Sequence, residues 1–171
     1  PLYSSAASDV YKRQYIEDAI YLKSRDNART PFPWNGNKEE GYGFSSGEPW
    51  IQYSPDNLSI HAEACLADSQ SIFYYYQKLI SLRHEFPIIA HGKYELINEK
   101  DSDVFSYLRK YKGQILLVVC SFSQQPTTSQ VPSEFVGHSV EHLIGNYTSN
   151  IQELPKFFEL APFEAQVFLL K

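Results

Sequence analysis

The spacing of apolar residues changes once along the chain, near residues 87–91. Before this point the clearest pattern is helical, with Asp68 or Ser69 available as the N-cap and Pro87 as the terminator. Its apolar positions are Ile72, Tyr75, Tyr76, Leu79, Leu82 and Phe86. Weaker helical patterns cover residues 15–23 and 60–66. The segment 24–50 has no period and is rich in Pro and Gly, which predicts a long ordered loop, and such loops are usually functional.

After residue 87 the period falls to about two, which is typical of half-buried strands. Short connectors rich in Gly, Asn, Asp and Ser separate these strands, and Lys112-Gly113 predicts the tip of a hairpin. Since no long helical pattern interrupts them, an antiparallel sandwich is expected. The expected strands are Lys93–Ile97, Val104–Tyr111, Gln114–Phe122, Ser139–Ile144, Phe157–Leu160 and Glu164–Leu170.

Charge and composition narrow the possible partners. The net charge of −5 makes nucleic acid and anionic membranes poor partners. No apolar run approaches the roughly 18 residues of a membrane-spanning helix. The aromatic content of 15% suits β-structure and also suits proteins that contact sugars, although most of these rings are expected in the core. Cys65 and Cys120 lie in apolar stretches and are expected as reduced, buried thiols, which favours a cytoplasmic location.

Side chains able to perform catalysis or bind a metal do not converge in this sequence. The five histidines lack metal-ligand spacing, because His138 and His142 are four residues apart in a loop and strand rather than on a helix. The candidate carboxylates, Glu39, Glu40, Glu85, Asp101 and Asp103, are all expected on solvated surface. We therefore predict no catalytic residue, no metal site and no cofactor within this chain.

The first fourteen residues, PLYSSAASDVYKRQ, have no amphipathic period. They resemble the translated adaptor-like sequence found at the ends of some assembled metagenomic fragments. We expect residues 1–14 to be a non-native leader, and we exclude them from the fold argument.

The segment Ser24 to Trp50 carries three motifs in order, SRDNARTP with Trp34 nearby, then GYGF, then GEPW. Together they resemble the last strand-to-helix loop of the catalytic barrel in oligo-1,6-glucosidases, trehalose-6-phosphate hydrolases and dextran glucosidases of glycoside hydrolase family thirteen. The following SIFYYYQKLISLRHEFPII resembles the final barrel helix, and the closing PFEAQVFLL resembles the end of the C-terminal domain. Many relatives have Met where this chain has Phe32, which leaves the linkage preference open.

This resemblance implies a fold of the class α/β plus all-β. Residues 15–87 would be the last loop and helix of a truncated (β/α)8 barrel, and residues 88–171 a C-terminal antiparallel β-sandwich. Arg29 is the expected substrate-binding residue, since a guanidinium can hold a carboxylate and a sugar hydroxyl at once. In the family, the matching Arg pairs with an Asp of an early barrel loop and grips the terminal glucose. A structural bridge between two loops is the alternative role for Arg29.

Most other residues of the loop are expected to have structural roles. Arg25 and Asp26 could pair locally or tie the loop to the barrel, and Asn27 could satisfy loop backbone groups. A sugar-stacking ring could be among the loop aromatics, but packing of the loop onto the barrel is favoured for each of them. These aromatics are Trp34, Tyr42, Phe44 and Trp50.

The function implied for the parent protein is that of a retaining, exo-acting α-glucosidase acting on oligosaccharides, with α-1,6 linkages favoured. Its catalytic carboxylates and usual metal site would lie upstream of this chain, so the chain alone is expected to be inactive. An α-1,4-glucosidase, a trehalose-6-phosphate hydrolase and a sucrose-acting relative stay possible. The alternatives from other classes are a stand-alone carbohydrate-binding β-sandwich and a purely structural module.

Overall fold

The computed structural model describes residues 13–20, 23 and 25–171, which belong to two compact units, residues 1–74 and 75–171. In the first unit, residues 13–20 are helical, and the rest of the expected helix at 15–23 lies partly outside the described residues. The segment 25–50 is irregular, as expected, apart from two 3-10 turns. The bounds of the short elements are η1 Arg25–Ala28, η2 Lys38–Gly43, η3 Pro55–Leu58 and α2 Ala62–Ala67.

Helix α3, Ile72–Glu85, is the long helix that the sequence predicts, and it begins in the first unit and continues in the second. Its predicted end at Pro87 is correct, but Pro87 also begins a second helix, α4, Pro87–His91. A proline suits the first turn of a helix because its missing N–H would have no partner there. The same residue therefore ends one helix and starts the next.

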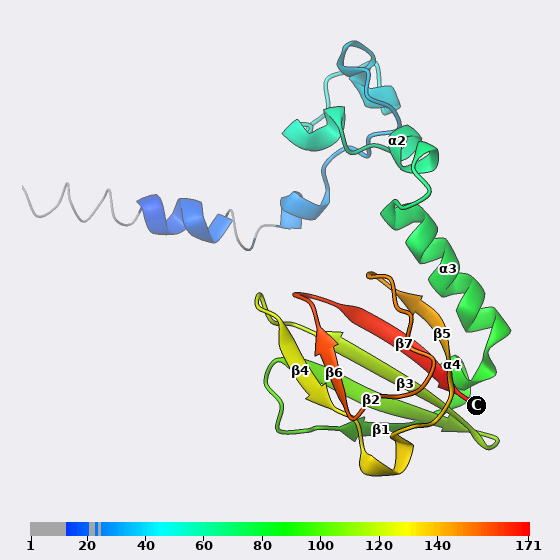
Figure 1. Ribbon diagram of the computed structural model, residues 1–171. Helices are drawn as coiled ribbons and strands as arrows, with labels where there is room; N and C mark the ends of the chain where they lie inside the picture. Colours follow the sequence, from blue (N-terminus) through cyan, green and yellow to red (C-terminus); the bar gives the residue numbers. More distant parts are fainter. Residues whose placement is uncertain (1–12, 21–22, 24) are drawn as a thin grey trace, which may run out of the picture. The chain divides into compact units, whose positions relative to one another are not determined.

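The second unit continues with two antiparallel sheets, and the structure confirms the expected sandwich (Figure 1). The larger sheet has the order β1-β2-β3-β7-β5, and the smaller one pairs β4 with β6. Between β2 and β3, Lys112 and Gly113 both have positive φ, 49° and 81°, as the predicted two-residue hairpin requires. The strands are β1 Lys93–Ile97, β2 Val104–Tyr111, β3 Gln114–Ser121, β4 Thr127–Gln130, β5 Val140–Gly145, β6 Phe157–Leu160 and β7 Ala165–Leu170.

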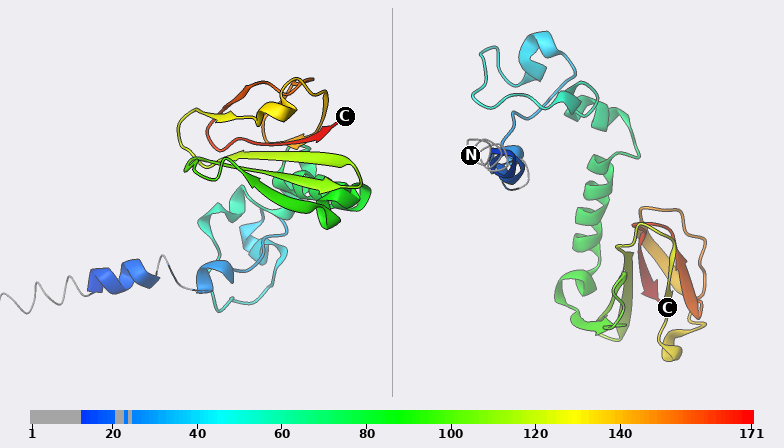
Figure 2. Two further views of the ribbon diagram at one scale, coloured as in Figure 1. Left: turned by 90° about the horizontal axis from the view of Figure 1, so that it is seen from below. Right: turned by 90° about the vertical axis from the view of Figure 1, so that its left-hand side faces the viewer.

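Two apolar clusters cover the two faces of the larger sheet. The cluster between the sheets is centred on Phe168, whose side chain is fully buried. The cluster on the outer face places Ile88 of α4 against Leu116, Val118 and Leu169. Helix α4 and the β4–β6 pair thus lie on opposite faces of the five-stranded sheet (Figure 2).

Arg109 of β2 fixes α4 to the sheet. Its Nε donates to the carbonyl of Ile88 at 3.2 Å, and its Nη2 donates to the carbonyl of Gly92 at 2.9 Å. The carbonyl of Ile88 also accepts from the N–H of Gly92, the C-cap residue, at 2.9 Å. The C-terminal end of a helix favours a cation near its carbonyls. The guanidinium therefore acts as the C-terminal cap of this helix.

We expect Arg109→Ala to lower the free energy of unfolding by about 2 kcal/mol, because two charge-assisted hydrogen bonds are lost from a half-buried site. Urea unfolding of the full chain measures this change. Lys171→Ala is the matched control, since it removes only the exposed ion pair with Glu141 at 3.5 Å. Equal midpoints for the two variants would contradict the capping role.

Both cysteines are free thiols, as predicted from the sequence, and each is half-buried. Burial raises the pKa of the Cys120 thiol, so this group stays protonated further into the alkaline range. Cys65 belongs to α2 in the first unit and Cys120 to β3 in the second.

Candidate functional site

Arg29 immediately follows the turn η1, and backbone and side-chain contacts both tie it to that turn. Its N–H donates to the carbonyl of Asp26 at 3.0 Å, and its Nη1 lies 3.6 Å from Asp26 Oδ1. The side chains of Arg29 and Asp26 are 59% and 63% exposed. An ion pair this open contributes at most about 1 kcal/mol, so it orients the guanidinium without removing it from solvent.

The loop beyond Arg29 is anchored to the start of α2. The N–H groups of Ala62 and Glu63 donate to the carbonyls of Pro33 and Trp34, each at 3.0 Å. His61 also caps this helix, because its Nδ1 accepts from the N–H of Ala64 at 3.1 Å. This cap is not predictable from the sequence, since a histidine is not among the usual N-cap residues. The helix N-terminus thus holds the middle of the loop.

Tyr42 is the one buried residue of η2, and the structure gives it a packing role within the first unit. Its ring meets Tyr53 edge-on at a centroid distance of 5.0 Å. Its carbonyl accepts from the N–H groups of Trp34 and Asn35, at 2.8 and 3.2 Å. Tyr42 and its neighbours Gly41 and Gly43 all have positive φ, so the chain reverses sharply around this ring.

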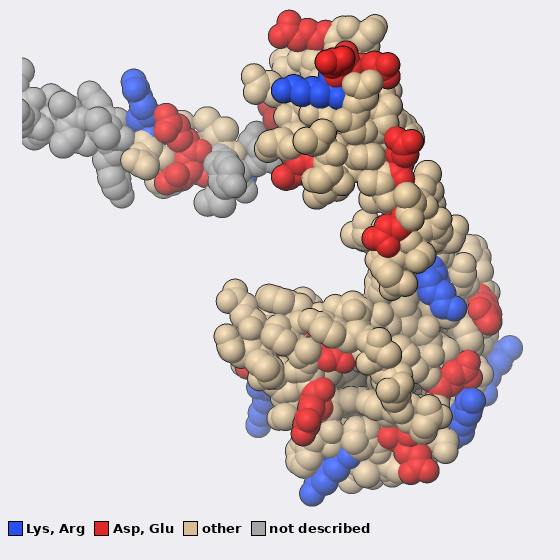
Figure 3. Space-filling model, turned by 45° about the horizontal axis from the view of Figure 1, so that its top comes forward, with Lys and Arg blue, Asp and Glu red and all other residues tan. Residues whose placement is uncertain are grey.

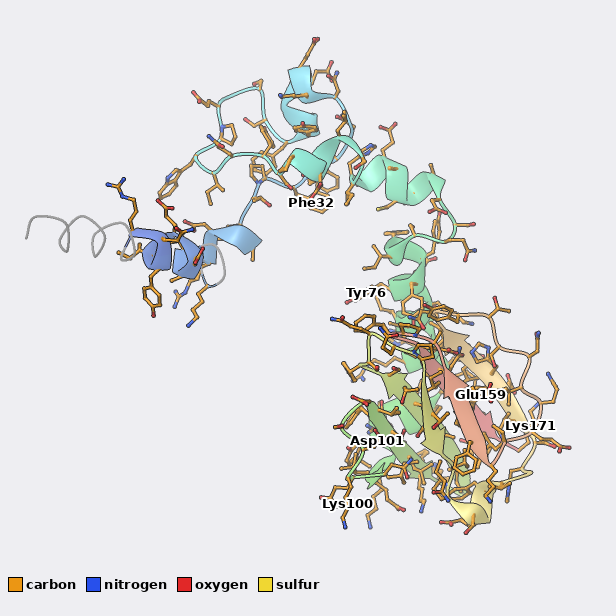
Figure 4. The ribbon with its side chains drawn as sticks, turned by 60° about the vertical axis from the view of Figure 1, so that its left-hand side comes forward. Phe32, Tyr76, Lys100, Asp101, Glu159 and Lys171 are labelled. Carbon is orange, nitrogen blue, oxygen red and sulfur yellow. The ribbon has the colours of Figure 1, made fainter. Side chains whose placement is uncertain are left out.

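The other aromatic side chains of the loop are open to solvent in this structure. The ring of Phe32, which is labelled in Figure 4, meets that of Trp34 edge-on at a centroid distance of 4.8 Å. Both residues are more than half exposed. Phe44 is half exposed and Trp50 is fully exposed. Their packing onto a barrel stays a prediction, and so does a sugar-stacking role for any of them.

The carboxylates of the candidate set do not converge. Glu39, Glu40 and Glu85 are exposed, and Asp101 Oδ1 accepts from the N–H groups of Asp103 and Val104 at 3.0 Å in the turn before β2. Within the described parts of the chain, no group of three or more His, Cys, Asp or Glu side chains could hold a metal ion. No helix among the described residues is long and apolar enough to cross a membrane.

Acidic and basic side chains are interspersed on the face shown in Figure 3, without a continuous basic area. Such a face offers no electrostatic footprint for a polyanion. In the described residues of the first unit, the site therefore consists of an oriented, exposed guanidinium and several open rings. This arrangement can bind a neutral, hydroxyl-rich ligand or a carboxylate.

Comparison with known protein families assigns each half of the chain to a known domain family. Residues 4–92 match the family model of the α-amylase catalytic domain, and residues 94–167 match that of the maltogenic amylase C-terminal domain. The first match begins within the segment 1–14 and ends one residue after α4. Arg29 and the loop that follows it thus lie in the part that matches the catalytic domain.

The individual relatives include oligo-1,6-glucosidases and trehalose-6-phosphate hydrolases. The chain is 40% identical over 170 residues to an oligo-1,6-glucosidase of Halalkalibacterium halodurans, covering 99% of this chain and 30% of the relative. It is 34% identical over 157 residues to a trehalose-6-phosphate hydrolase of Bacillus subtilis, covering 92% of this chain and 28% of the relative. The chain thus spans less than a third of the length of these curated relatives.

A solved structure with the same fold is the trehalose-6-phosphate hydrolase of Bacillus licheniformis. It matches with a TM-score of 0.84 and 37% identity, over 99% of this chain and 31% of that protein. A trehalulose synthase mutant in complex with Tris matches with a TM-score of 0.80 and 32% identity, over 89% of this chain and 27% of that protein. The resemblance seen in the loop motifs is therefore confirmed, and the chain belongs to the α-amylase family.

Proposed function

We propose that this chain is the C-terminal part of a retaining, exo-acting α-glucosidase, and that it supplies the arginine that grips the terminal sugar. The observation that carries the proposal is the position of Arg29, oriented by Asp26 at 3.6 Å and still 59% exposed, within the part that matches the catalytic domain. Active sites of α/β barrels form from the loops that follow the strands. The loop that contains Arg29 is proposed to face the substrate.

The proposed chemistry divides between two parts of the enzyme. Glycoside cleavage with retention needs two carboxyl groups about 5–5.5 Å apart in a substrate pocket, whereas Glu39, Glu40 and Glu85 of this chain are exposed. In the proposal, an upstream part of the polypeptide provides the nucleophile and the acid/base. Arg29 holds a carboxylate with one edge of its guanidinium and the sugar hydroxyls with the other, and so closes the pocket behind the terminal glucose.

We favour oligosaccharides with α-1,6 bonds as substrates, because relatives from several bacteria are oligo-1,6-glucosidases. Trehalose 6-phosphate is the second candidate, supported by the hydrolases of that name among the relatives and the solved structures. A stand-alone carbohydrate-binding role for the β-sandwich has less support, because both tryptophans lie in the first unit.

The test uses the chain alone and a chimera. In the chimera, residues 13–171 replace the corresponding region of the Halalkalibacterium oligo-1,6-glucosidase. We expect no turnover of isomaltose by the chain alone and clear turnover by the chimera, because the upstream part contributes the two carboxylates. Release of glucose from isomaltose and from trehalose 6-phosphate is measured for both proteins.

Two results would contradict the proposal. Turnover of isomaltose by the purified chain alone would show that the chain holds its own catalytic groups. A folded chimera that hydrolyses trehalose 6-phosphate and leaves isomaltose intact would show that the second candidate is correct.

A further inference from the structure

Asn35 is the only asparagine of the chain that precedes a glycine. Because Gly36 has no side chain, its backbone nitrogen is accessible and its backbone has a wide range of conformations. This nitrogen can therefore act as a nucleophile toward Cγ, the side-chain carbonyl carbon of Asn35. Both residues lie in the irregular stretch before η2, and both are partly exposed, so that water reaches them.

The side chain of Asn35 is turned toward the backbone that follows it. Its Oδ1 accepts from the N–H of Asn37 at 3.0 Å, which closes an Asx turn across Gly36. Because this hydrogen bond spans Gly36, it keeps Cγ of Asn35 close to the Gly36 nitrogen. The N–H of Asn37 also stabilises the negative charge that develops on Oδ1 when Cγ is attacked, as the donors of an oxyanion hole do.

The attacking nitrogen and the leaving nitrogen are both without other partners. Within the described parts of the chain, neither the N–H of Gly36 nor the Nδ2 group of Asn35 donates a hydrogen bond. Nδ2 lies beside Gly43, since a Cβ added to Gly43 would be 2.9 Å from it. Gly43 is exposed, so the side-chain amide can leave toward solvent.

We propose that Asn35 is a site of spontaneous covalent modification, at which the chain supplies the nucleophile and water is the only co-reactant. The Gly36 nitrogen loses its proton to solvent and forms a bond to Cγ of Asn35. The bond between Cγ and Nδ2 breaks, and Nδ2 takes up a proton and leaves as ammonia. Water then opens the resulting succinimide at either carbonyl, which gives aspartate or isoaspartate at position 35.

Asn146 shows the opposite situation and is the internal control. It is followed by Tyr147, whose side chain hinders attack by the backbone nitrogen. Its Nδ2 donates to the carbonyl of Phe163 at 2.8 Å, and its Oδ1 accepts from the N–H of Ala165 at 2.7 Å. These hydrogen bonds hold the amide in place, so Asn146 is expected to react far more slowly than Asn35.

Isoaspartate at position 35 would lengthen the backbone at a closely packed point, because the chain would then pass through Cβ and Cγ of this residue. Gly36 has little room to move. A Cβ added to it would lie 3.0 Å from His61 Nε2 and 3.3 Å from the carbonyl oxygen of Leu58. On the other side, the N–H of Asn35 donates to the carbonyl of Tyr42 at 3.2 Å. The longer backbone must therefore weaken the contacts on at least one side.

Aspartate at position 35 leaves the length of the backbone unchanged. Its carboxylate also keeps an acceptor for the N–H of Asn37. We therefore expect the isoaspartate form, and not the aspartate form, to loosen the loop. This inference does not depend on the role proposed for Arg29.

The test is to age the purified full chain in mildly alkaline buffer made with water enriched in heavy oxygen. Mass spectrometry of its peptides records the heavy oxygen incorporated at each asparagine, and isoaspartyl-specific methylation identifies isoaspartate. We expect Asn35 to react about tenfold faster than Asn146 or more, and its rate to rise with pH because attack needs the deprotonated Gly36 nitrogen. Asn35→Gln is expected to abolish labelling here, since the longer side chain would have to close a larger ring.

Ageing in guanidinium chloride separates the effect of the fold from that of the sequence. We expect Asn35 in the folded chain to react within about tenfold of its rate in the unfolded chain. Reaction of Asn35 only in the unfolded chain would show that the fold protects it, and would overturn the proposal. Equal rates at Asn35 and Asn146 in the folded chain would do the same.

Hydrogen exchange measures the consequence for the loop. The N–H groups of Ala62 and Glu63, which donate to the carbonyls of Pro33 and Trp34, report on its anchor. We expect them to exchange about tenfold faster in the isoaspartate form, as for the loss of one hydrogen bond.

Two variants control this measurement. The exchange of the same N–H groups is expected to stay unchanged in Asn35→Asp and in aged Asn35→Gln. Equal exchange in the fresh and the aged chain would show that isoaspartate does not loosen the loop. Because no readout is hydrolysis of a sugar, failure of this inference is distinct from failure of the proposed enzymatic function.

Discussion

Replacing Arg29 with Gln in the chimera is expected to reduce kcat/KM for isomaltose by about 100-fold or more. Each charge-assisted hydrogen bond to a sugar or carboxylate contributes about 1.5–3 kcal/mol, and a 100-fold loss corresponds to about 2.7 kcal/mol. Gln keeps a donor and most of the side-chain volume but loses the charge and the paired donors. Steady-state kinetics with isomaltose measure the effect.

If Arg29 had a purely structural role, Arg29→Gln would lower the stability of the chain, and this loss would account for any loss of activity. The exposed position of Arg29 predicts the opposite. Its ion pair with Asp26 is exposed on both sides, so Arg29→Gln is expected to change the free energy of unfolding of the chain by less than about 1 kcal/mol. Arg25→Gln is the matched control, since Arg25 is an exposed arginine of the same turn. Equal losses of kcat/KM in the two variants, or a loss of stability that accounts for the lost activity, would show that Arg29 is structural.

The β-domain could be predicted from the sequence almost strand by strand, because each predicted strand has alternating or continuously apolar side chains between clear turn residues. Strand β4 was missed because its sequence, Thr-Thr-Ser-Gln, is polar and only four residues long. It exists because it pairs with β6, with Thr128 opposite Glu159, and such pairing is not visible in local periodicity. Helix α4 was missed because Pro87 indicates the end of a helix more strongly than the start of one.

Of the candidate site, only the identity of its residues could be predicted, from the motif SRDNARTP and the loop that follows it. The loop sequence identifies Arg29, but the turn η1 and the contact with Asp26 depend on backbone angles that no periodicity encodes. The burial of Tyr42 likewise depends on three successive residues with positive φ, of which only the two glycines are suggestive in the sequence. The positive φ of Phe163, 56°, was likewise not predictable, because a phenylalanine gives no local signal for this conformation.

Removal of the Phe168 ring is expected to be the most destabilising change in the β-domain. Phe168 is fully buried between the two sheets, and its ring stacks on that of Phe158 at a centroid distance of 5.6 Å. The ring of His142 lies 5.3 Å away on the neighbouring strand β5. Phe168→Ala would therefore leave a cavity at the centre of the sandwich, bounded by residues from both sheets.

The expected loss is about 3–5 kcal/mol, because truncation of a buried Phe removes its transfer free energy and also leaves unfilled volume. Domains of this size are stable by about 5–15 kcal/mol, so a large part of the stability of residues 75–171 depends on this one ring. Urea unfolding of the full chain should show the midpoint at a much lower urea concentration, with Phe157→Ala as the exposed control. If both variants unfold at the same concentration, the sheets must pack around a different centre.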